Sequence, residues 1–384
     1  MMIRTAKRLE SVQEYYFSTK LREVRELIAQ GKPVINMGIG SPDLSPPQEV
    51  LTSFQDSLFE EGAHQYQSYQ GLPELRQTMS EFYQNKFGVS TDPGKEILPL
   101  MGSKEGIMHI SMAFLNAGDE VLIPNPGYPT YSAVSKLVGA EPRHYELQES
   151  NNWFPDLERL SKEDLTNVRV MWVSYPHMPT GAIAQKEQLE KLVTFSRTHN
   201  ILVINDNPYS FVLSKNPLSV LSIPGAKDTV LELNSLSKTF NMAGWRVGMV
   251  IGHEDHIQAI LKVKSNMDSG MFYGIQKGAI SALRSGPFWF DQLDAIYRKR
   301  QQLVFQLADM LGCSYDQEAT GMFVWAKLPE GSKKSTEYID EILHEKHVFI
   351  APGTVFGSAG EGYIRFSLCV KEDKIREAIK RFVK

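Results

Sequence analysis

Short apolar runs alternate with longer amphipathic segments through the middle of the chain, from about residue 95 to residue 285. The short runs are rich in Val, Ile and Leu, which is typical of buried strands, and the longer segments repeat apolar residues at helical spacing. The expected strands are Ile97–Met101, Glu120–Ile123, Arg143–Leu147, Arg169–Ser174, Ile201–Asp206, Val230–Asn234 and Val247–Ile251. Helices are expected between several of them, including Glu105–Asn116 and Gln185–His199. This alternation predicts an α/β fold with a mostly parallel sheet covered by helices.

The pattern changes near Pro287, where a long charged helix (290–311) precedes a β-rich segment (321–328) and an αβ ending. The first 45 residues contain an expected helix, 13–30, and a short extended piece, and neither fits the start of the large sheet. We therefore expect a large domain and a smaller α+β domain formed by both ends of the chain. The expected limits are residues 46–286 for the large domain, and residues 1–45 with 287–384 for the small one.

Composition excludes several classes of protein. The chain has 384 residues, 42% of them hydrophobic, and a formal net charge of -4, so we expect no nucleic-acid surface. Its two cysteines form neither a disulfide framework nor a metal-ligand spacing. The first ten residues carry charge throughout, unlike a secretory signal, and the chain has no apolar run of about 18 residues, as a membrane span would need. The expected location is the cytoplasm.

Polar and aromatic residues directly follow the expected strands. Ligands of open α/β sheets bind beyond the carboxyl ends of the strands, so these residues are candidates for one site. They are Gly102–Lys104, Pro124–Tyr128, Tyr175–Gly181, Asp206–Tyr209 and Ser235–Lys238.

Lys238 is the most informative of these residues. It follows an apolar run, and Ser235, Ser237 and Arg246 lie within eight residues of it. A lysine beside phosphate-binding groups suits an enzyme whose amine forms an imine with an aldehyde cofactor. The alternative is an ordinary surface lysine after a strand.

Gly102-Ser103-Lys104 precedes a helix expected to begin at Glu105, and backbone N–H groups at a helix start can hold an anion. The run lacks the full pattern of a nucleotide P-loop, so a nucleotide is not indicated. A simple strand-to-helix turn is the alternative.

A carboxylate at the end of an apolar strand, such as Asp206, needs a partner, and a protonated ring nitrogen would serve. Tyr209 could donate to a phenolic oxygen, and Tyr128, in a proline-rich run, could lie flat against a ring. Arg365 has apolar neighbours and could grip a carboxylate with two hydrogen bonds. Ordinary packing, a helix cap or an internal salt bridge would explain each of these residues separately.

Together these segments resemble the class I/II (fold-type I) pyridoxal-phosphate-dependent aminotransferases, from about residue 33 to the C-terminus. The motifs that carry the resemblance are Gly38–Asp43, Tyr66 with Gly71–Arg76, Pro126–Pro129, Pro179–Gly181, Asp206 with Tyr209, Ser235–Lys238 with Arg246, and Arg365. The resemblance implies an enzyme that moves an amino group from an L-amino acid to a 2-oxo acid, with pyridoxal 5'-phosphate (PLP) as cofactor in the large domain.

The resemblance also implies a role for each residue. Lys238 would carry the cofactor as a Schiff base and move the proton, Asp206 would pair with the ring nitrogen, Tyr209 would contact the phenolic oxygen, and Tyr128 would stack on the ring. The residues expected at the phosphate are Ser103, Lys104, Ser235, Ser237 and Arg246.

Arg365 and the backbone of Gly40 would hold the α-carboxylate of the substrate. Tyr66 would reach the phosphate of a neighbouring subunit, which implies a homodimer. The runs Ile35–Leu44 and Gly102–His109 look closest to the LL-diaminopimelate aminotransferase branch. In that branch Tyr15 would contact the substrate, although the adjacent Tyr16 leaves the register open.

One position departs from the family pattern. Met178 stands where the family usually has an asparagine that hydrogen-bonds the phenolic oxygen. A thioether cannot donate a hydrogen bond, so that oxygen lacks one donor unless His177 or a water replaces it. We expect the extra negative charge to raise the pKa of the protonated imine relative to an asparagine-bearing enzyme.

Two other functions stay open at this point. A PLP-dependent β-eliminating lyase would use the same lysine, aspartate and arginine, and a PLP-binding regulatory module would keep the fold without catalysis. A nicotinamide dehydrogenase is disfavoured, because Gly38-Ile-Gly40 runs into Ser-Pro-Asp rather than completing a dinucleotide motif.

Overall fold

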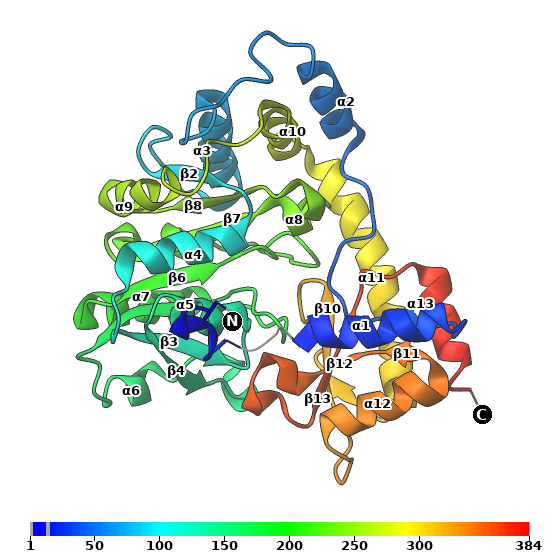
Figure 1. The fold of residues 1–384 in the computed structure, drawn as a ribbon. Coiled ribbons are helices and arrows are strands. Elements are labelled where there is room, and N and C mark those ends of the chain that lie inside the picture. Colours follow the sequence, from blue (N-terminus) through cyan, green and yellow to red (C-terminus); the bar gives the residue numbers. More distant parts are fainter. Residues whose placement is uncertain (1–2, 13–15, 384) are drawn as a thin grey trace.

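The computed structural model describes residues 3–12 and 16–383, and its centre is a seven-stranded sheet covered by helices (Figure 1). The strand order is β2-β8-β7-β6-β5-β3-β4. β8 runs antiparallel to both of its neighbours, and all other pairs are parallel. The strands are β2 (Ile97–Leu100), β3 (Glu120–Asn125), β4 (Glu141–Glu146), β5 (Val168–Val173), β6 (Leu202–Asp206), β7 (Val230–Ser235) and β8 (Gly248–Ile251).

These are the seven strands expected from the sequence, each within two residues of its expected limits. The mostly parallel α/β fold is therefore confirmed. Apolar side chains cover both faces of the sheet, as a parallel sheet between helices requires. On β3, for example, Val121 and Ile123 belong to one core and Leu122 to the other.

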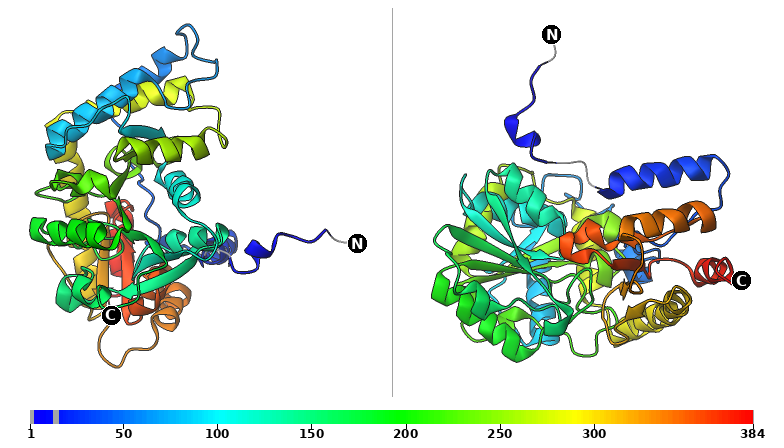
Figure 2. Two further views of the ribbon diagram at one scale, coloured as in Figure 1. Left: turned by 90° about the vertical axis from the view of Figure 1, so that its left-hand side faces the viewer. Right: turned by 90° about the horizontal axis from the view of Figure 1, so that it is seen from below.

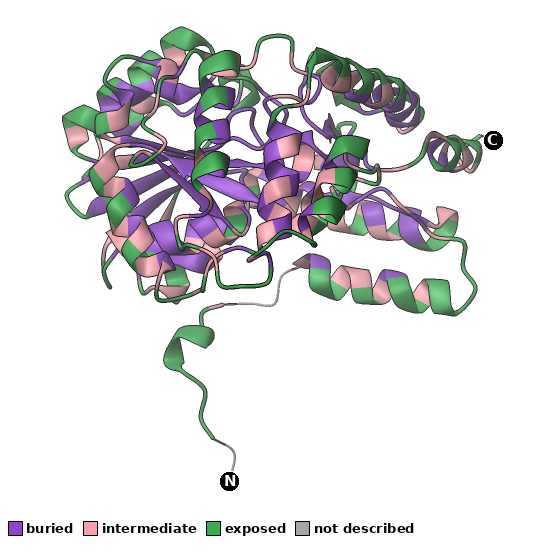
Figure 3. Ribbon diagram, turned by 90° about the horizontal axis from the view of Figure 1, so that it is seen from above, coloured by how far each residue is buried: buried purple, intermediate pink, exposed green. Residues whose placement is uncertain are grey.

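Helices pack on both faces of this sheet. Ile107 of α4 and Ile257 of α9 belong to one core, whereas Leu75 of α3 and Leu189 of α7 belong to the other. Figure 3 shows the sheet buried beneath helices whose outer faces are exposed. The helices of this part are α2 (Gln48–Ser57), α3 (Pro73–Phe87), α4 (Ser103–Phe114), α5 (Thr130–Leu137), α6 (Leu157–Leu160), α7 (Lys186–His199), α8 (Leu236–Thr239), α9 (Glu254–Lys264) and α10 (Tyr273–Leu283).

A second, four-stranded antiparallel sheet has the order β12-β13-β10-β9. The N-terminal segment joins the C-terminal elements, because β1 pairs in parallel with β11 through Ile35 and Val348. The elements here are α1 (Tyr16–Ala29), β1 (Ile35–Asn36), α11 (Pro287–Met310), β9 (Ser314–Tyr315), β10 (Phe323–Lys327), α12 (Ser335–Lys346), β11 (Val348–Phe349), β12 (Ala351–Pro352), β13 (Tyr363–Ser367) and α13 (Glu372–Lys380).

The N-terminal segment, residues 3–12, projects away from the body of the molecule (Figure 2). Nearly all of its residues are exposed, including Ile3 and Leu9. Within the described part of the chain, no helix is both long and apolar enough to cross a membrane.

Candidate active site

A cavity of about 470 Å³ opens at the carboxyl ends of the strands of the large sheet. Most residues that the sequence singled out line it together, from both ends of the chain. They are Gly40, Ser103, Lys104, Tyr128, Asp206, Tyr209, Ser235, Ser237, Lys238, Arg246 and Arg365. Two candidates are not among them: Tyr66 is exposed elsewhere, and Tyr15 lies outside the described residues.

Lys238 lies on α8, directly after β7, and its Nζ donates a hydrogen bond to the Gly40 carbonyl at 2.6 Å. Burial lowers the pKa of the amine, and the guanidinium groups of Arg365 and Arg246 lower it further. A larger fraction of the amine is therefore neutral than on an exposed lysine, which favours nucleophilic attack.

Asp206 ends β6 inside the protein, and its Oδ2 accepts a hydrogen bond from the Tyr131 hydroxyl at 2.8 Å. Burial raises the pKa of Asp206 to about 6, and the Tyr131 hydrogen bond opposes that rise. Its other oxygen, Oδ1, is buried and has no hydrogen-bond partner among the described residues. The unsatisfied acceptor identifies a place for a donor on a ligand.

Tyr131 is a site residue that the sequence reasoning missed. It lies in the first turn of α5 and stacks on Trp172, with ring centroids 4.9 Å apart and planes 5° apart. Tyr128, three residues earlier, meets the Tyr131 ring edge-on at 5.6 Å. The i, i+3 spacing of the two tyrosines did not identify Tyr131, because Tyr128 precedes α5 and the spacing alone reads as packing.

The expected anion seat joins the starts of α4 and α8. Ser235 caps α8, because its Oγ accepts from the Ser237 N–H at 3.1 Å and donates to the Ser237 Oγ at 2.8 Å. On the α4 side, Gly102 has a φ of +90°, and a Cβ there would clash with Nη2 of Arg246. The glycine therefore lets the guanidinium lie against the turn before Ser103, beside the N–H groups of the helix start.

Arg365 lies on β13 between aromatic rings. Its guanidinium carbon is 3.8 Å from the Phe323 ring centroid and 4.4 Å from that of Phe356. Nη2 donates to the Gly38 carbonyl at 2.9 Å, and Nη1 lies 3.4 Å from Met178 Sδ. The rings fix the plane of a cation that faces the cavity, as bidentate recognition of a carboxylate requires.

Met178 lines the cavity, whereas its neighbour His177 is not among the described residues that do so. Nδ1 of His177 is 2.8 Å from Thr180 Oγ1, and burial lowers the pKa of the imidazole to about 3. The imidazole is thus neutral and engaged by a neighbour. The thioether beside Arg365 is the group that this chain presents at the family's asparagine position.

Tyr209 and α1 complete the walls. Burial raises the pKa of Tyr209, so its hydroxyl stays protonated and able to donate. Phe17, Ser18 and Leu21 of α1 form part of the outer wall, which the sequence reasoning did not anticipate because it assigned that side to Tyr15.

The donor set fits a flat phosphorylated aromatic aldehyde. It combines an anion seat, a low-pKa amine, an aromatic wall and a buried carboxylate oxygen that awaits a donor such as a protonated ring nitrogen. Arg365 adds a site for a second, carboxylate-bearing molecule.

Comparison with known proteins agrees with this chemistry. The family model described as "Aminotransferase class I and II" matches residues 32–382. An LL-diaminopimelate aminotransferase of Dehalococcoides mccartyi is 39% identical over 381 residues, covering 99% of this chain and 98% of the relative. One from Nitratidesulfovibrio vulgaris is 38% identical, covering 98% and 97%.

Solved structures show the same fold. Substrate-bound BacF from Bacillus subtilis superposes with a TM-score of 0.93 at 33% identity, covering 99% of this chain and 97% of that one. An aspartate aminotransferase of Thermus thermophilus, at 24% identity, shares the fold with a TM-score of 0.92 and 99% coverage of both chains. The chain belongs to the class I and II aminotransferases, and it is a pyridoxal-phosphate-dependent transaminase.

Proposed function

We propose that Lys238 is the residue that bonds to PLP and moves the proton during transamination. Two lysines line the cavity, and the observation that distinguishes them is burial: Lys104 is exposed at the start of α4, whereas Lys238 is largely buried and has a lowered pKa. A neutral amine is the form that attacks an aldehyde and later accepts a proton.

Borohydride reduction of the PLP-loaded enzyme, followed by peptide mapping, tests the assignment. We expect the label on Lys238, complete loss of transamination in Lys238→Ala, and retained labelling in Lys104→Ala as the matched control. A label on Lys104, or near-normal turnover of Lys238→Ala, would contradict the assignment.

When bound, PLP supplies an aldehyde that condenses with amines and a ring that withdraws electrons from the substrate's α-carbon. Asp206 would keep the ring nitrogen protonated through Oδ1, and Tyr131 would hold that carboxylate in its ionised form. Tyr209 would donate to the ring's phenolic oxygen, and Tyr128 would lie against the ring.

The segment Gly38–Gly40 contacts both Arg365 and Lys238. Its Gly38 carbonyl accepts from Arg365 and its Gly40 carbonyl accepts from Lys238. A carboxylate held by Arg365 is therefore presented next to the amine that would take the α-proton. Both glycines are needed for this approach, because a Cβ on either one would clash with an aromatic ring.

We propose that the enzyme is a homodimer in which Tyr66 reaches the neighbouring cofactor phosphate. The Tyr66 side chain is 91% exposed. Exposed apolar side chains occur in the same region, among them Phe59 and Phe272. Light scattering should give twice the mass of the chain, and a monomer that is active at assay concentration would contradict the arrangement.

The amino donor we propose first is LL-diaminopimelate, because the relatives that match 98–99% of this chain carry that name. An amino acid with an apolar side chain is the second candidate, favoured by Phe17, Leu21 and Ile39 on the outer wall of the cavity. A screen of both donors against 2-oxoglutarate decides between them. Repeated turnover of a donor without any 2-oxo acid acceptor would instead indicate β-elimination.

Residues 46–286 form the cofactor-binding domain in this proposal, and residues 1–45 with 287–384 form the smaller one. The pairing of β1 with β11 and the separate four-stranded sheet support that division. We also propose a cytoplasmic location, supported by two cysteines, Cys313 and Cys369, that are buried and free.

A further inference from the structure

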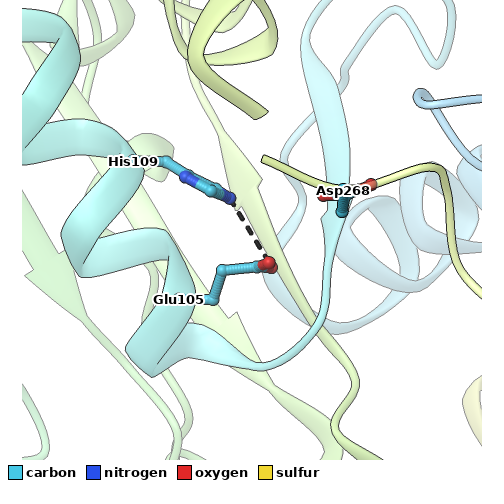
Figure 4. A group of neighbouring side chains, drawn as sticks. All are labelled: Glu105, His109 and Asp268. Atoms are coloured by element: carbon cyan, nitrogen blue, oxygen red, sulfur yellow. Dashed lines mark ion pairs between the residues drawn. The ribbon is translucent and has the colours of Figure 1, made fainter. Parts of the chain in front are cut away.

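Four ionisable side chains, Glu105, His109, Lys264 and Asp268, form a cluster outside the cavity, at the first turns of α4. Ligand atoms of Glu105, His109 and Asp268 all lie within 4.8 Å of one another (Figure 4). His109 Nε2 is 3.4 Å from Glu105 Oε1, and the histidine is only 1% exposed. Lys264, the last residue of α9, is fully buried and bonds to Asp268 Oδ1 at 2.8 Å. None of these four lines the cavity, so direct contact with a substrate does not explain them.

A bound metal ion is not the best explanation of the cluster. The ammonium of Lys264 already supplies a positive charge to Asp268. A divalent cation would place two further charges beside that buried ammonium, where repulsion is strong. We call the cluster the junction, because its side chains come from three segments: α4, the end of α9 and the turn that begins at Asp268.

On one side, the junction contacts the turn before Ser103, one of the residues expected at the cofactor phosphate. Glu105 Oε2 accepts a hydrogen bond from the backbone N–H of Met101 at 2.7 Å. Met101 directly precedes the Gly102 turn, and Ser103 begins α4. Glu105 thereby closes the turn that presents Ser103 to the cavity.

On the other side, the junction contacts the Gly270 turn, which approaches the segment that carries Tyr66. Asp268 Oδ1 also accepts from the Gly270 N–H at 2.8 Å. Gly270 has a φ of +87°, and a Cβ there would clash with the carbonyl oxygen of Gln67, one residue from Tyr66. The close approach is between the backbone of Gly270 and the backbone carbonyl of Gln67, and neither can move aside as a side chain would. The position of the Gly270 turn therefore determines where residue 67 lies.

A buried glutamine fixes the far end of the same loop. Gln276 Nε2 donates to the Met271 carbonyl at 2.7 Å, and its Oε1 accepts from the Leu72 N–H at 2.7 Å. The chain after Tyr66 thus approaches the turn closely at Gly270 and is linked to Met271 through Gln276, while the tyrosine side chain itself is exposed.

We propose that Asp268 is a positioning residue for phosphate recognition, acting through the Gly270 turn on Tyr66 of the same chain. Ligand atoms of Asp268, Glu105 and His109 lie within 4.8 Å of one another, so the carboxylate that bonds to the Gly270 turn lies next to the one that bonds to the turn before Ser103. This inference rests on the proposed function, in which PLP occupies the cavity and Tyr66 reaches across the dimer.

The test compares how apo-enzyme binds PLP and pyridoxal, which lacks the phosphate. The main variant is Lys264→Met/Asp268→Ala, because removing both charges avoids leaving a buried ammonium unpaired. Asp268→Asn is the conservative variant, since its amide oxygen still accepts from Gly270. Asp255→Asn, an exposed carboxylate on the neighbouring α9, is the control.

We expect the main variant to bind PLP about tenfold more weakly, the order of one lost hydrogen bond to a charged group, and to bind pyridoxal normally. Asp268→Asn and the control should bind both as the wild type does. In a Tyr66→Phe background the effect of the main variant should disappear, because coupled residues do not contribute additively. If the main variant does not fold, Gly270→Ala tests the same link with the charges intact.

Equal weakening of pyridoxal binding would overturn the proposal, since it would indicate a general structural defect. Independent effects of Tyr66→Phe and the main variant would also overturn it, as would loss of PLP affinity after treatment with a chelator. Failure of the wild type to bind PLP would instead refute the proposed function.

Discussion

Asp206 is held in the cavity at a cost to the stability of the apo-enzyme. Burial raises its pKa from 3.8 to about 6, and the hydrogen bond from Tyr131 opposes that rise. Because the folded-state pKa lies above that of the unfolded chain, the folded protein binds this proton more tightly. The free energy of unfolding therefore falls as the pH rises from about 4 to about 6.

The size of the effect follows from the shift. A rise of about two pKa units, at 1.36 kcal/mol per unit, corresponds to about 3 kcal/mol lost once the carboxyl is ionised. Asp206→Asn keeps the shape and an acceptor for the Tyr131 hydroxyl but removes the charge. We expect this variant to stabilise the apo-enzyme by up to about 3 kcal/mol at pH 8 and to lose transaminase activity.

Thermal unfolding of PLP-free protein between pH 4.5 and pH 8 measures this difference. The advantage of Asp206→Asn over the wild type should be largest at pH 8 and shrink as the carboxyl of the wild type becomes protonated. Added PLP should stabilise the wild type more than the variant, since only the wild type offers a charge to the ring nitrogen. A variant that is no more stable at pH 8, or whose advantage does not depend on pH, would refute the reasoning.

Three further substitutions test other parts of the site. Tyr131→Phe removes the hydrogen bond that lowers the pKa of Asp206, so the acidic limb of the pH–rate profile should move up by about one to two units; an unmoved limb would contradict the assigned role. Gly102→Ala should weaken PLP binding, measured by titration, whereas Gly118→Ala, with a similar positive φ but nothing within 4 Å, should not; equal effects would point to backbone strain alone. Met178→Asn supplies a donor to the phenolic oxygen, so the pKa read from the absorbance of the Lys238-bound cofactor should fall, and an unchanged or higher value would argue against the charge argument.

The sheet was predictable because the evidence for it is local. Most of the strands are buried on both faces, so they read as apolar runs, as β6 and β7 do. The exception is β4 at the sheet edge, most of whose residues are exposed or half-buried. Asp206 and Lys238 could be named as candidate site residues, because Asp206 ends such a run and Lys238 follows one at the ligand-binding edge of the sheet.

Other parts of the site could not be predicted in this way. Tyr131 lies three residues after Tyr128 and reads as core, and only the path of the chain brings its hydroxyl to Asp206. Gly102 reads as a turn residue until Arg246 is seen lying against it. The outer wall from α1 depends on how the N-terminal helix packs, which no local pattern specifies.

The sequence by itself determined the order of strands and helices in the large sheet, the change of pattern near Pro287, and the residues that could do the chemistry. Periodicity and strand ends suffice for that, because burial imposes its pattern on neighbouring residues of one segment. The tertiary structure decided which groups are buried and which distant segments meet. The lowered pKa of Lys238, the unsatisfied oxygen of Asp206 and the junction at Asp268 all depend on loss of solvent and on contacts across hundreds of residues. Those properties belong to the packed chain, and they are what turn a lysine after a strand into a candidate catalyst.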